Sequence, residues 1–252
     1  MILMRFLLIV YFVCVSFVCA AEEFKHLSPK KIKWKFDGIL GSFDKQSIQR
    51  GYQVYREVCS SCHSMKRIAF RNLRDVGFSE EEVKAIAASY QVLDGPNDIG
   101  EMFERPGIKS DYFIPPFPNK EAAMAANKGA FPPDLSLIIK ARHNGANYLY
   151  SLLTGYESHD PDESGLYTNP YFTTGKMSMA PPLSDGLVQY TDGTDSKVEN
   201  MAYDVVNFLQ WAAEPEMETR KKLGIKVISF LLVLTIFVIL ANKRLWKDLY
   251  KK

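Results

Sequence analysis

The sequence predicts a mainly α-helical protein with one membrane-spanning helix near its C-terminus. Apolar residues recur at helical spacing in several segments that begin at capping residues and end at glycine or proline. Alternating apolar and polar residues, which would indicate strands, are scarce. Residues 223–242 form a run of twenty positions with a single charge, which is the length a helix needs to cross a bilayer.

Composition limits the class of protein before any motif is considered. Of the 252 residues, 47% are hydrophobic and 13% aromatic, which excludes a disordered chain. Lys and Arg number 31 against 29 Asp and Glu, and this balance excludes a polybasic protein that binds nucleic acid. Four cysteines are too few for a small domain held together by disulfides.

The first residues have the pattern of an export signal. One positive charge, Arg5, precedes an apolar run over 6–18 that is too short to span a bilayer, and small residues follow it. We predict that residues 1–21 are a signal peptide cleaved after Ala20 or Ala21. An uncleaved anchor and a lipidated cysteine near the cleavage site are the alternatives, and neither changes the side of the membrane reached by the rest.

The apolar run near the C-terminus is predicted to stop this export. Residues 22–219 would then lie outside, residues 223–242 would span the membrane, and the basic residues 243–252 would form a cytoplasmic tail. The alternative for the run is a buried core helix. Because the signal is short and lacks the many Arg and Ser residues of a mitochondrial presequence, we predict a bacterial inner membrane with the exported part on the periplasmic side.

The exported part is acidic. Residues 22–219 contain 21 Lys and Arg against 28 Asp and Glu, a formal charge of −7. A single acidic cluster can be no more than a solvated face, but a net charge over the whole domain attracts partners of opposite sign. The sequence therefore predicts a basic soluble partner.

Three helices are predicted in the first half of the exported part. Ser42 and Asp44 open a segment whose apolar residues share one face. Ser79 with Glu82 forms a capping box, and Asn119 caps an alanine-rich stretch that ends at a glycine.

Three further helices are predicted in the second half, each ending at or just before a glycine or proline: 134–143, 147–154 and 198–212. Between the helices lie segments rich in Pro and Gly, notably 94–118 and 155–182, which we predict to be loops. Loops of this length commonly carry function.

One short motif has its residue types and spacing dictated by chemistry: Cys59-Ser60-Ser61-Cys62-His63. It matches the attachment motif of c-type haem. Two thiols this far apart can each bond one vinyl group of a single porphyrin, and the adjacent His63 can then bind the iron. A zinc site would need about four ligands, and a thioredoxin-like thiol pair would need a βαβ unit that the sequence does not indicate.

The sixth ligand of the iron decides what such a haem can do. Methionine opposite histidine raises the reduction potential and closes the iron to small molecules, whereas an open position suits catalysis or sensing. The residue types that could serve include His26, His143, His159 and several methionines. Met177 and Met179 stand out because they lie in the sequence GKMSMAPP, whose prolines can fix a loop against the ring.

Longer strings around the motif make the prediction more specific. They are RGYQVYREVCSSCHSM, DGPNDIGEMFERPG, GAFPPDLSLIIKARHNGANYLYSLLTGY, GLYTNPYF and MAPPL, followed by FLQWAAEPE before the basic-flanked anchor. From about Trp34 to the C-terminus, the chain resembles the cytochrome c1 family, the membrane-anchored haem subunits of cytochrome bc1 complexes. The resemblance implies a class I c-type cytochrome domain with long loops, followed by one C-terminal transmembrane helix.

The resemblance also implies which methionine binds the iron. In the family the axial methionine directly precedes Ala-Pro-Pro, which here is Met179 and not Met177. Many bacterial relatives carry a cysteine pair between the positions of Gly155 and Met179, and this chain lacks it. We therefore expect the methionine loop to depend on its prolines and contacts for rigidity.

Four further residues match positions of the family's haem pocket. Arg142 and Tyr148 correspond to the residues that hold the haem propionates, and Asn127 and Pro133 to other pocket positions. A buried propionate needs hydrogen-bond donors, which a guanidinium and a phenol supply. From spacing alone, a surface ion pair for Arg142 and an ordinary helix-face aromatic for Tyr148 would fit equally well.

The function implied by the resemblance is electron relay in the respiratory quinol:cytochrome c oxidoreductase. One electron would come from the Rieske iron-sulfur protein through one covalent haem c and pass to a basic cytochrome c, while the anchor packs on cytochrome b in the lipid. No acid, base or nucleophile is required of the chain. The alternatives are a membrane-anchored haem peroxidase or gas sensor with an open sixth position, and a thiol oxidoreductase that uses Cys59 and Cys62.

Overall fold

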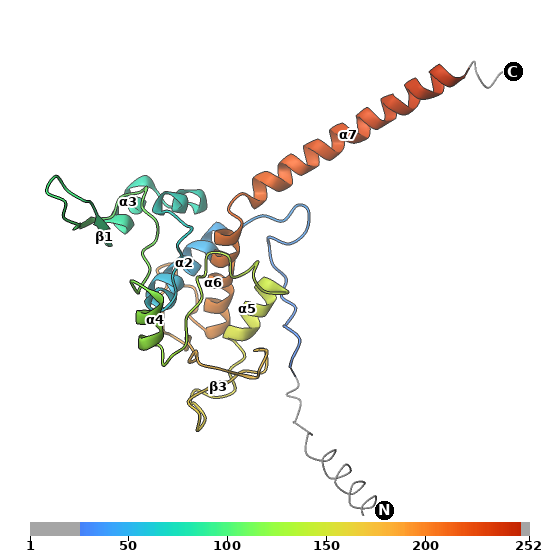
Figure 1. The fold of residues 1–252 in the computed structure, drawn as a ribbon. Coiled ribbons are helices and arrows are strands. Elements are labelled where there is room, and N and C mark those ends of the chain that lie inside the picture. The colour runs from blue at the N-terminus through green and yellow to red at the C-terminus, as the bar shows by residue number, and fades with distance from the viewer. Residues whose placement is uncertain (1–25, 248–252) are drawn as a thin grey trace, which may run out of the picture.

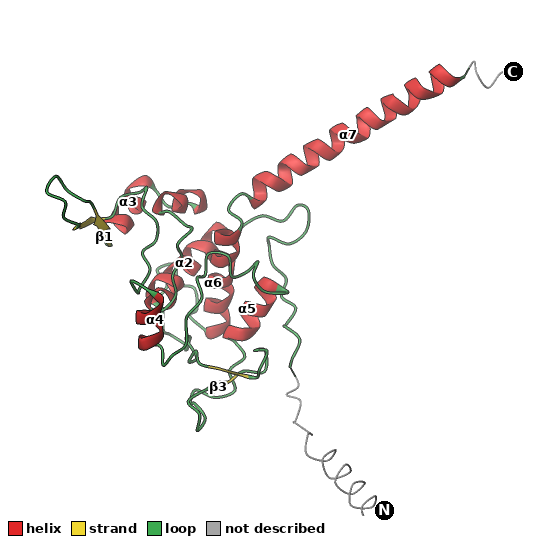
Figure 2. Cartoon of the chain, in the orientation of Figure 1, coloured by secondary structure: helices red, strands yellow, loops and turns green. Residues whose placement is uncertain are grey.

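Two crossing helices, α2 (Lys45–Glu57) and α6 (Val198–Ala213), form the centre of the structure, a computed structural model that describes residues 26–247. Shorter helices and long loops surround them, and one long helix leaves the domain (Figures 1 and 2). The mainly helical fold class is confirmed. The predicted signal, 1–21, and the last residues of the predicted tail lie outside the described residues.

Helices α2 and α6 approach each other closely at Gly51. A Cβ atom there would overlap the backbone of Asp204 on α6. The Asp204 carboxylate, whose side chain is 3% exposed, accepts hydrogen bonds from Ser47 Oγ at 2.6 Å and from Arg50 Nε at 2.7 Å. Arg50 also donates from Nη1 to Asp192 at 2.9 Å. The side chains of Ser47 and Arg50 thus link α2 to Asp204 of α6 beside Gly51.

Aromatic side chains fill the core around this crossing. Tyr55 of α2 stacks on Phe113 with ring centres 6.0 Å apart, and Phe208 of α6 lies 5.6 Å from the Tyr55 ring. Offset and edge contacts of this kind stabilise aromatic pairs beyond the area they bury. The largest side chains that are almost completely buried include Trp211, Phe70, Phe208 and Met65.

The first two of the three capping predictions in the first half are confirmed. Helix α2 begins directly after Asp44, whose carboxylate accepts from Ser47 N at 3.4 Å. Helix α3 (Glu80–Ala88) begins at the predicted capping box: Ser79 Oγ accepts from Glu82 N, and the Glu82 carboxylate accepts from Ser79 N.

Helix α4 (Lys120–Ala126) is also capped as predicted, because the Asn119 side chain accepts from Ala122 N at 2.8 Å. Helix α5 (Gly145–Leu153) begins two residues before the predicted segment and ends within it. The segment 70–76, for which no element was predicted, forms a 3-10 helix, η2 (Phe70–Val76).

The predicted helix over 134–143 is wrong. The segment is a series of turns, with backbone bonds such as Lys140 N to Leu137 O at 3.0 Å. The beginning of this segment is bonded to the residues that follow the haem motif: Leu135 N donates to Ser64 O at 2.8 Å. Leu135, Ile138 and Ile139 of this segment are buried in the core, so tertiary packing overrides the local preference for a helix.

Short antiparallel strands lie within or at the start of the two segments predicted to be loops. Strands β1 (Gln91–Asp94) and β2 (Phe103–Pro106) form one hairpin, with Val92 opposite Arg105. Strands β3 (Tyr167–Thr168) and β4 (Lys176–Met177) form the other pair, shown as the yellow strand at the bottom of Figure 2. Strands this short give little periodic signal in a sequence.

Helix α7 (Met217–Trp246) is the predicted membrane span. It has 30 residues, a most apolar window with mean hydropathy 2.7, and exposed apolar side chains along its whole length. Among the described residues it is the one helix long and apolar enough to cross a membrane. Because apolar residues are exposed all round rather than packed on the domain, the alternative of a buried core helix is not supported.

Candidate haem-binding site

The cysteine motif lies at the C-terminal end of α2. After Glu57 the chain tightens into a 3-10 helix, η1 (Cys59–Ser61), in which Cys62 N and His63 N both donate to Cys59 O at 3.2 and 2.9 Å. Both cysteines are free thiols, Cys59 partly buried and Cys62 exposed. One turn of chain therefore presents two thiols and a histidine, and neither thiol is in a disulfide bond.

Cys59 is poorly suited to be the attacking thiol of a redox pair. Burial raises the pKa of the Cys59 thiol to about 12, and negative charge at Cys62 adds to the effect. An attacking thiol needs a lowered pKa instead. The described residues also contain no βαβ unit around the motif, which is the context of a thioredoxin-like pair.

The ring of His63 is oriented by a residue seventy positions away in the sequence. Its Nδ1 lies 2.8 Å from the carbonyl oxygen of Pro133. A carbonyl can only accept, so Nδ1 carries the proton and the lone pair is on Nε2. Burial lowers the pKa of His63 more than Pro133 and Asp134 raise it, which favours the neutral ring. A neutral imidazole with one nitrogen bonded to a carbonyl is the form that binds metals.

Asp134 holds the chain on which Pro133 lies. Its Oδ2 accepts from Ser64 Oγ at 2.7 Å and from Lys66 N at 3.0 Å. These bonds connect the residues after His63 to the Pro133 turn. They position the carbonyl that orients the histidine.

The loop with the two candidate methionines is organised by Tyr156. The Tyr156 hydroxyl donates to the carbonyl oxygen of Met179 at 3.0 Å and lies 3.6 Å from Met177 Sδ. Burial raises the pKa of Tyr156, with a contribution from Tyr167, so the hydroxyl stays protonated. The sulfur of Met177 is thus in contact with a donor, whereas within residues 26–247 no hydrogen bond reaches the sulfur of Met179.

Polar contacts brace this loop in place of a disulfide. Asn169, 0% exposed, donates from Nδ2 to Leu152 O and from its backbone N to Gly175 O, both at 2.8 Å. Lys176 pairs with Asp162 at 2.6 Å across the same loop. The loop thus has the kind of contacts on which its rigidity was expected to depend. Tyr156 and Asn169 were not predicted, because they carry no local motif.

Arg142 and Tyr148 are brought close to each other. Burial raises the pKa of Tyr148, and the nearby Arg142 guanidinium counteracts part of this effect. The Arg142 side chain is exposed and donates from Nη1 to the carbonyl of Ala141 at 3.1 Å. Most of its N–H groups face solvent, so an anionic ligand could reach them.

The remaining candidates are placed less specifically. The Asn127 side chain donates to Ala123 O at 2.7 Å and closes helix α4. The ring of His26 bonds Tyr171 O at 2.9 Å, and His143 and His159 are exposed. Within residues 26–247, no hydrogen bond or ion pair connects these side chains to the cysteine motif.

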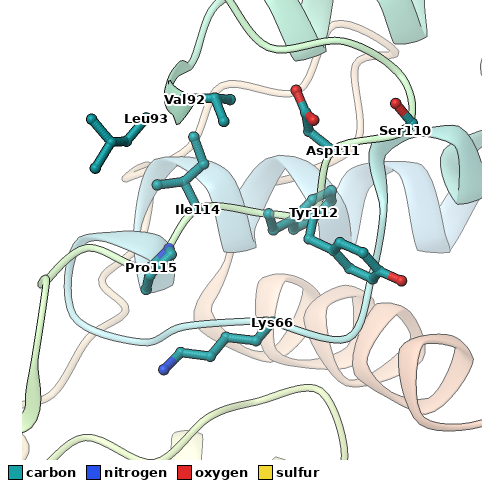
Figure 3. A pocket seen from close by; sticks show the side chains of 9 residues that line it. Lys66, Val92, Leu93, Ser110, Asp111, Tyr112, Ile114 and Pro115 are labelled. Carbon is teal, nitrogen blue, oxygen red and sulfur yellow. The ribbon is translucent and has the colours of Figure 1, made fainter. Parts of the chain in front are cut away.

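An open hollow of about 570 Å³ lies next to the segment after His63 (Figure 3). Phe113 forms part of its wall, and Asp111 at the rim pairs with Arg105 at 2.7 Å. None of the predicted site residues lines the hollow. Its lining consists of Lys66, Val92, Leu93, Ser110, Asp111, Tyr112, Phe113, Ile114 and Pro115.

The donor set fits a c-type haem. Two free thiols lie in one turn, a histidine presents a free Nε2 beside them, and a methionine sulfur is free of hydrogen bonds in a braced loop. No group of three or more His, Cys, Asp and Glu that could hold a metal ion occurs within residues 26–247.

Comparison with known proteins agrees with this geometry. The sequence model of the Cytochrome C1 family matches residues 34–249. The chain belongs to the cytochrome c1 family. c-type haem is the cofactor of that family.

Relatives of this chain in the cytochrome c1 family include plant and bacterial proteins. A protein of Arabidopsis thaliana named "Cytochrome c1 1, heme protein, mitochondrial" is 52% identical over 236 residues, covering 91% of this chain and 76% of its own. "Cytochrome c1" of Rhodospirillum rubrum is 48% identical over 241 residues, covering 88% and 89%. "Cytochrome b/c1" of Bradyrhizobium diazoefficiens is 44% identical over 245 residues, covering 87% of this chain and 36% of its own.

Proposed function

We propose that this chain is the haem-bearing electron-transfer subunit of a cytochrome bc1 complex, taking one electron from the Rieske iron-sulfur protein and passing it to cytochrome c. The observation that carries the proposal is the pairing of His63 Nδ1 with the Pro133 carbonyl at 2.8 Å, directly after two free thiols. This arrangement prepares Nε2 for iron. Membership of the cytochrome c1 family supports the same role.

Each site residue has a defined task in this proposal. Cys59 and Cys62 hold the haem through two thioether bonds, and His63 and Met179 are the axial ligands. Arg142 and Tyr148 hold the propionates, and Asn127 and Pro133 complete the pocket. The bound haem supplies an iron that accepts and releases one electron. The protein itself contributes attachment, ligand geometry and exclusion of water, and no acid, base or nucleophile of its own.

Histidine–methionine ligation is favoured over an open sixth position by the contacts of the loop. Met179 is held through its own carbonyl by Tyr156, while the sulfur of Met177 is in contact with the same hydroxyl. A braced methionine closes the iron to small ligands and raises the reduction potential. Both properties suit relay rather than peroxidase or gas-sensing chemistry.

Unpaired acidic groups support a basic cytochrome c as the acceptor. Some acids are neutralised within the domain, such as Glu80 by Arg74 at 2.8 Å and Asp162 by Lys176. Others form no ion pair among residues 26–247: Glu81, Asp98, Glu101, Glu104, Glu157, Asp160 and Glu163. A field from such groups speeds encounter with a basic partner at low salt.

The membrane arrangement follows from α7 and the export signal. We propose that residues 1–21 are removed, that residues 22–219 lie on the periplasmic side of a bacterial inner membrane, that 223–242 span it and that 243–252 lie in the cytoplasm. In the complex, α7 packs on cytochrome b and lipid. The Bradyrhizobium relative, whose name joins cytochromes b and c1, supports cytochrome b as the partner.

A potentiometric titration of the haem-loaded chain, followed by visible absorption, tests the proposal. We expect one single-electron step at a positive potential. Met179→Leu should lower the potential and let carbon monoxide bind the reduced iron. The matched variant Met177→Leu should change neither property.

The outcomes separate the possible functions. A strongly negative potential in the unmodified chain, with carbon monoxide binding, would instead favour a haem enzyme or sensor. Equal effects of the two variants, or an effect of Met177→Leu alone, would reject Met179 as the ligand. A purified protein without a covalent haem spectrum would reject the whole proposal.

A further inference from the structure

A turn before α2 presents two apolar side chains to solvent. Gly41 N donates to Gly38 O at 3.4 Å, so Ile39 and Leu40 are the two central residues of a four-residue turn. Ile39 is 75% exposed and Leu40 85%. The central positions of such turns ordinarily carry Gly, Pro, Asn, Asp or Ser. Isoleucine and leucine at this tip bury little apolar surface against the domain, which indicates a binding partner outside it.

This turn is tied to the beginning of α7. Lys221 Nζ donates to the carbonyl oxygens of Phe36 at 2.6 Å and Gly41 at 3.2 Å, one on each side of the turn. Glu218 Oε1 accepts from Phe43 N at 2.7 Å. Figure 1 shows the turn as the blue loop beside the base of α7. Both ends of the turn are therefore held by the first two turns of the membrane helix.

The base of the turn is rigid, so its tip cannot fold back onto the domain. Trp34 and Phe36 are buried and stack with ring centres 5.3 Å apart. Gly38 has φ +73°, a conformation that other residues rarely adopt, and a Cβ on Gly41 would overlap the backbone of Asp37. The backbone thus holds Ile39 and Leu40 outward.

The tip lies at the level where α7 changes from charged to apolar. Lys221 precedes Leu223, the first exposed residue of the apolar run, by two positions, about 3 Å along a helix axis. Lys222 and Lys226 flank that boundary, where lysines reach lipid headgroups. The turn and the end of the charged segment are thus at one height.

We propose that Ile39 and Leu40 insert into the interfacial layer of the membrane at the point where α7 enters it. Shallow burial of apolar side chains next to basic residues is how interfacial anchors bind lipid. A protruding tip of two residues is far smaller than the roughly 800 Å² that each partner contributes to a stable protein interface. The domain would then touch the membrane at two points, which restricts its tilt about α7.

Three isoleucines with comparable exposure allow a matched experiment, which rests on the proposed membrane insertion of α7. Each is replaced by cysteine in the full haem-loaded chain, in which the haem occupies Cys59 and Cys62, and labelled with an environment-sensitive fluorophore. The chain is reconstituted into phosphatidylcholine–phosphatidylglycerol vesicles with or without brominated lipid. The variants, in a Cys14→Ser, Cys19→Ser background, are Ile39→Cys at the tip, Ile99→Cys on the β1–β2 hairpin and Ile236→Cys within α7.

We expect brominated lipid to quench the labels at 39 and 236, with blue-shifted emission, and to leave the label at 99 unquenched and open to aqueous iodide. If 236 is quenched and 39 behaves like 99, the lipid contact is refuted while the membrane span stands. If 236 is also unquenched, the proposed insertion of α7 fails. If position 39 is shielded from both lipid and iodide in the assembled complex, a partner subunit covers the turn and the lipid contact is refuted.

Discussion

The hydroxyl of Tyr156 controls how firmly the methionine loop is held. It is the one side-chain donor within residues 26–247 that reaches the carbonyl of Met179, at 3.0 Å, and it also lies 3.6 Å from Met177 Sδ. Tyr156→Phe removes this donor and preserves the ring. The Met179 carbonyl then loses a partner in a partly buried position. If Met179 binds the iron, as proposed, the state in which it has left the iron becomes easier to reach.

The size of the effect follows from the number of bonds lost. A neutral hydrogen bond contributes about 1 kcal/mol net, and the sulfur contact is the weaker of the two because thioether sulfur is a poor acceptor. A change of about 1 kcal/mol shifts an equilibrium about fivefold. The population with an open sixth position should rise by that factor, and so should the apparent affinity of the oxidised chain for imidazole.

Imidazole titration followed by visible absorption measures this affinity directly. Tyr167→Phe is the matched control, since its hydroxyl makes no hydrogen bond in the described part of the chain. We expect about fivefold tighter imidazole binding for Tyr156→Phe and no change for the control. If imidazole binds both variants and the unmodified chain equally, the hydroxyl does not hold the loop and the reasoning is refuted.

Three further predictions concern stability and partner binding. Asp204→Ala should lower the free energy of unfolding by about 2–3 kcal/mol, because it leaves Arg50 without its buried partner. Asp192→Asn, which removes the charge of the exposed partner of Arg50, should lower it by less than about 1 kcal/mol. Chemical denaturation of both variants measures these two changes. Burial raises the pKa of Asp134, but its hydrogen bonds lower it by more, so the pKa is lowered overall. The ionised Asp134 therefore stabilises the fold above the ordinary carboxyl pKa. This stabilisation is lost as the pH falls through the lower pKa of the folded state. When the free energy of unfolding is measured against pH, it should fall less steeply toward acid pH for Asp134→Asn than for the unmodified chain. An unchanged slope would contradict this role of the Asp134 carboxylate. Electron transfer to a basic cytochrome c should slow steeply with added salt in stopped-flow experiments, and a salt-independent rate would leave the acidic groups as solvated surface.

Features that depend on neighbouring residues were predictable from the sequence. The Asp44 cap, the Ser79–Glu82 capping box and the Asn119 cap are each decided within one helical turn, and the structure contains all three. The apolar run of α7 is likewise a property of consecutive residues. In these places local hydrogen bonding and local hydrophobicity outweigh anything the rest of the chain contributes.

The prediction failed where distant partners compete with local bonds. Residues 134–143 have the composition of a helix, but Leu135 N bonds Ser64 O and Asp134 bonds Ser64 Oγ, seventy residues away. The side chains of Leu135, Ile138 and Ile139 are buried in the core, and this packing overrides the local preference for a helix. Strands of two to four residues, such as β3, escaped prediction for a related reason, since their pairing partner and not their own pattern defines them.

The sequence by itself determined the chemistry: two thiols and a histidine at haem spacing, a methionine before Ala-Pro-Pro, and a membrane span. Tertiary structure alone decided the geometry. It brought the Pro133 carbonyl to His63 and the Tyr156 hydroxyl to the methionine loop, and it set the Ile39–Leu40 turn beside α7. Residue types at fixed spacing are readable along the chain, whereas contacts between distant segments depend on how the whole core packs, which no local pattern records.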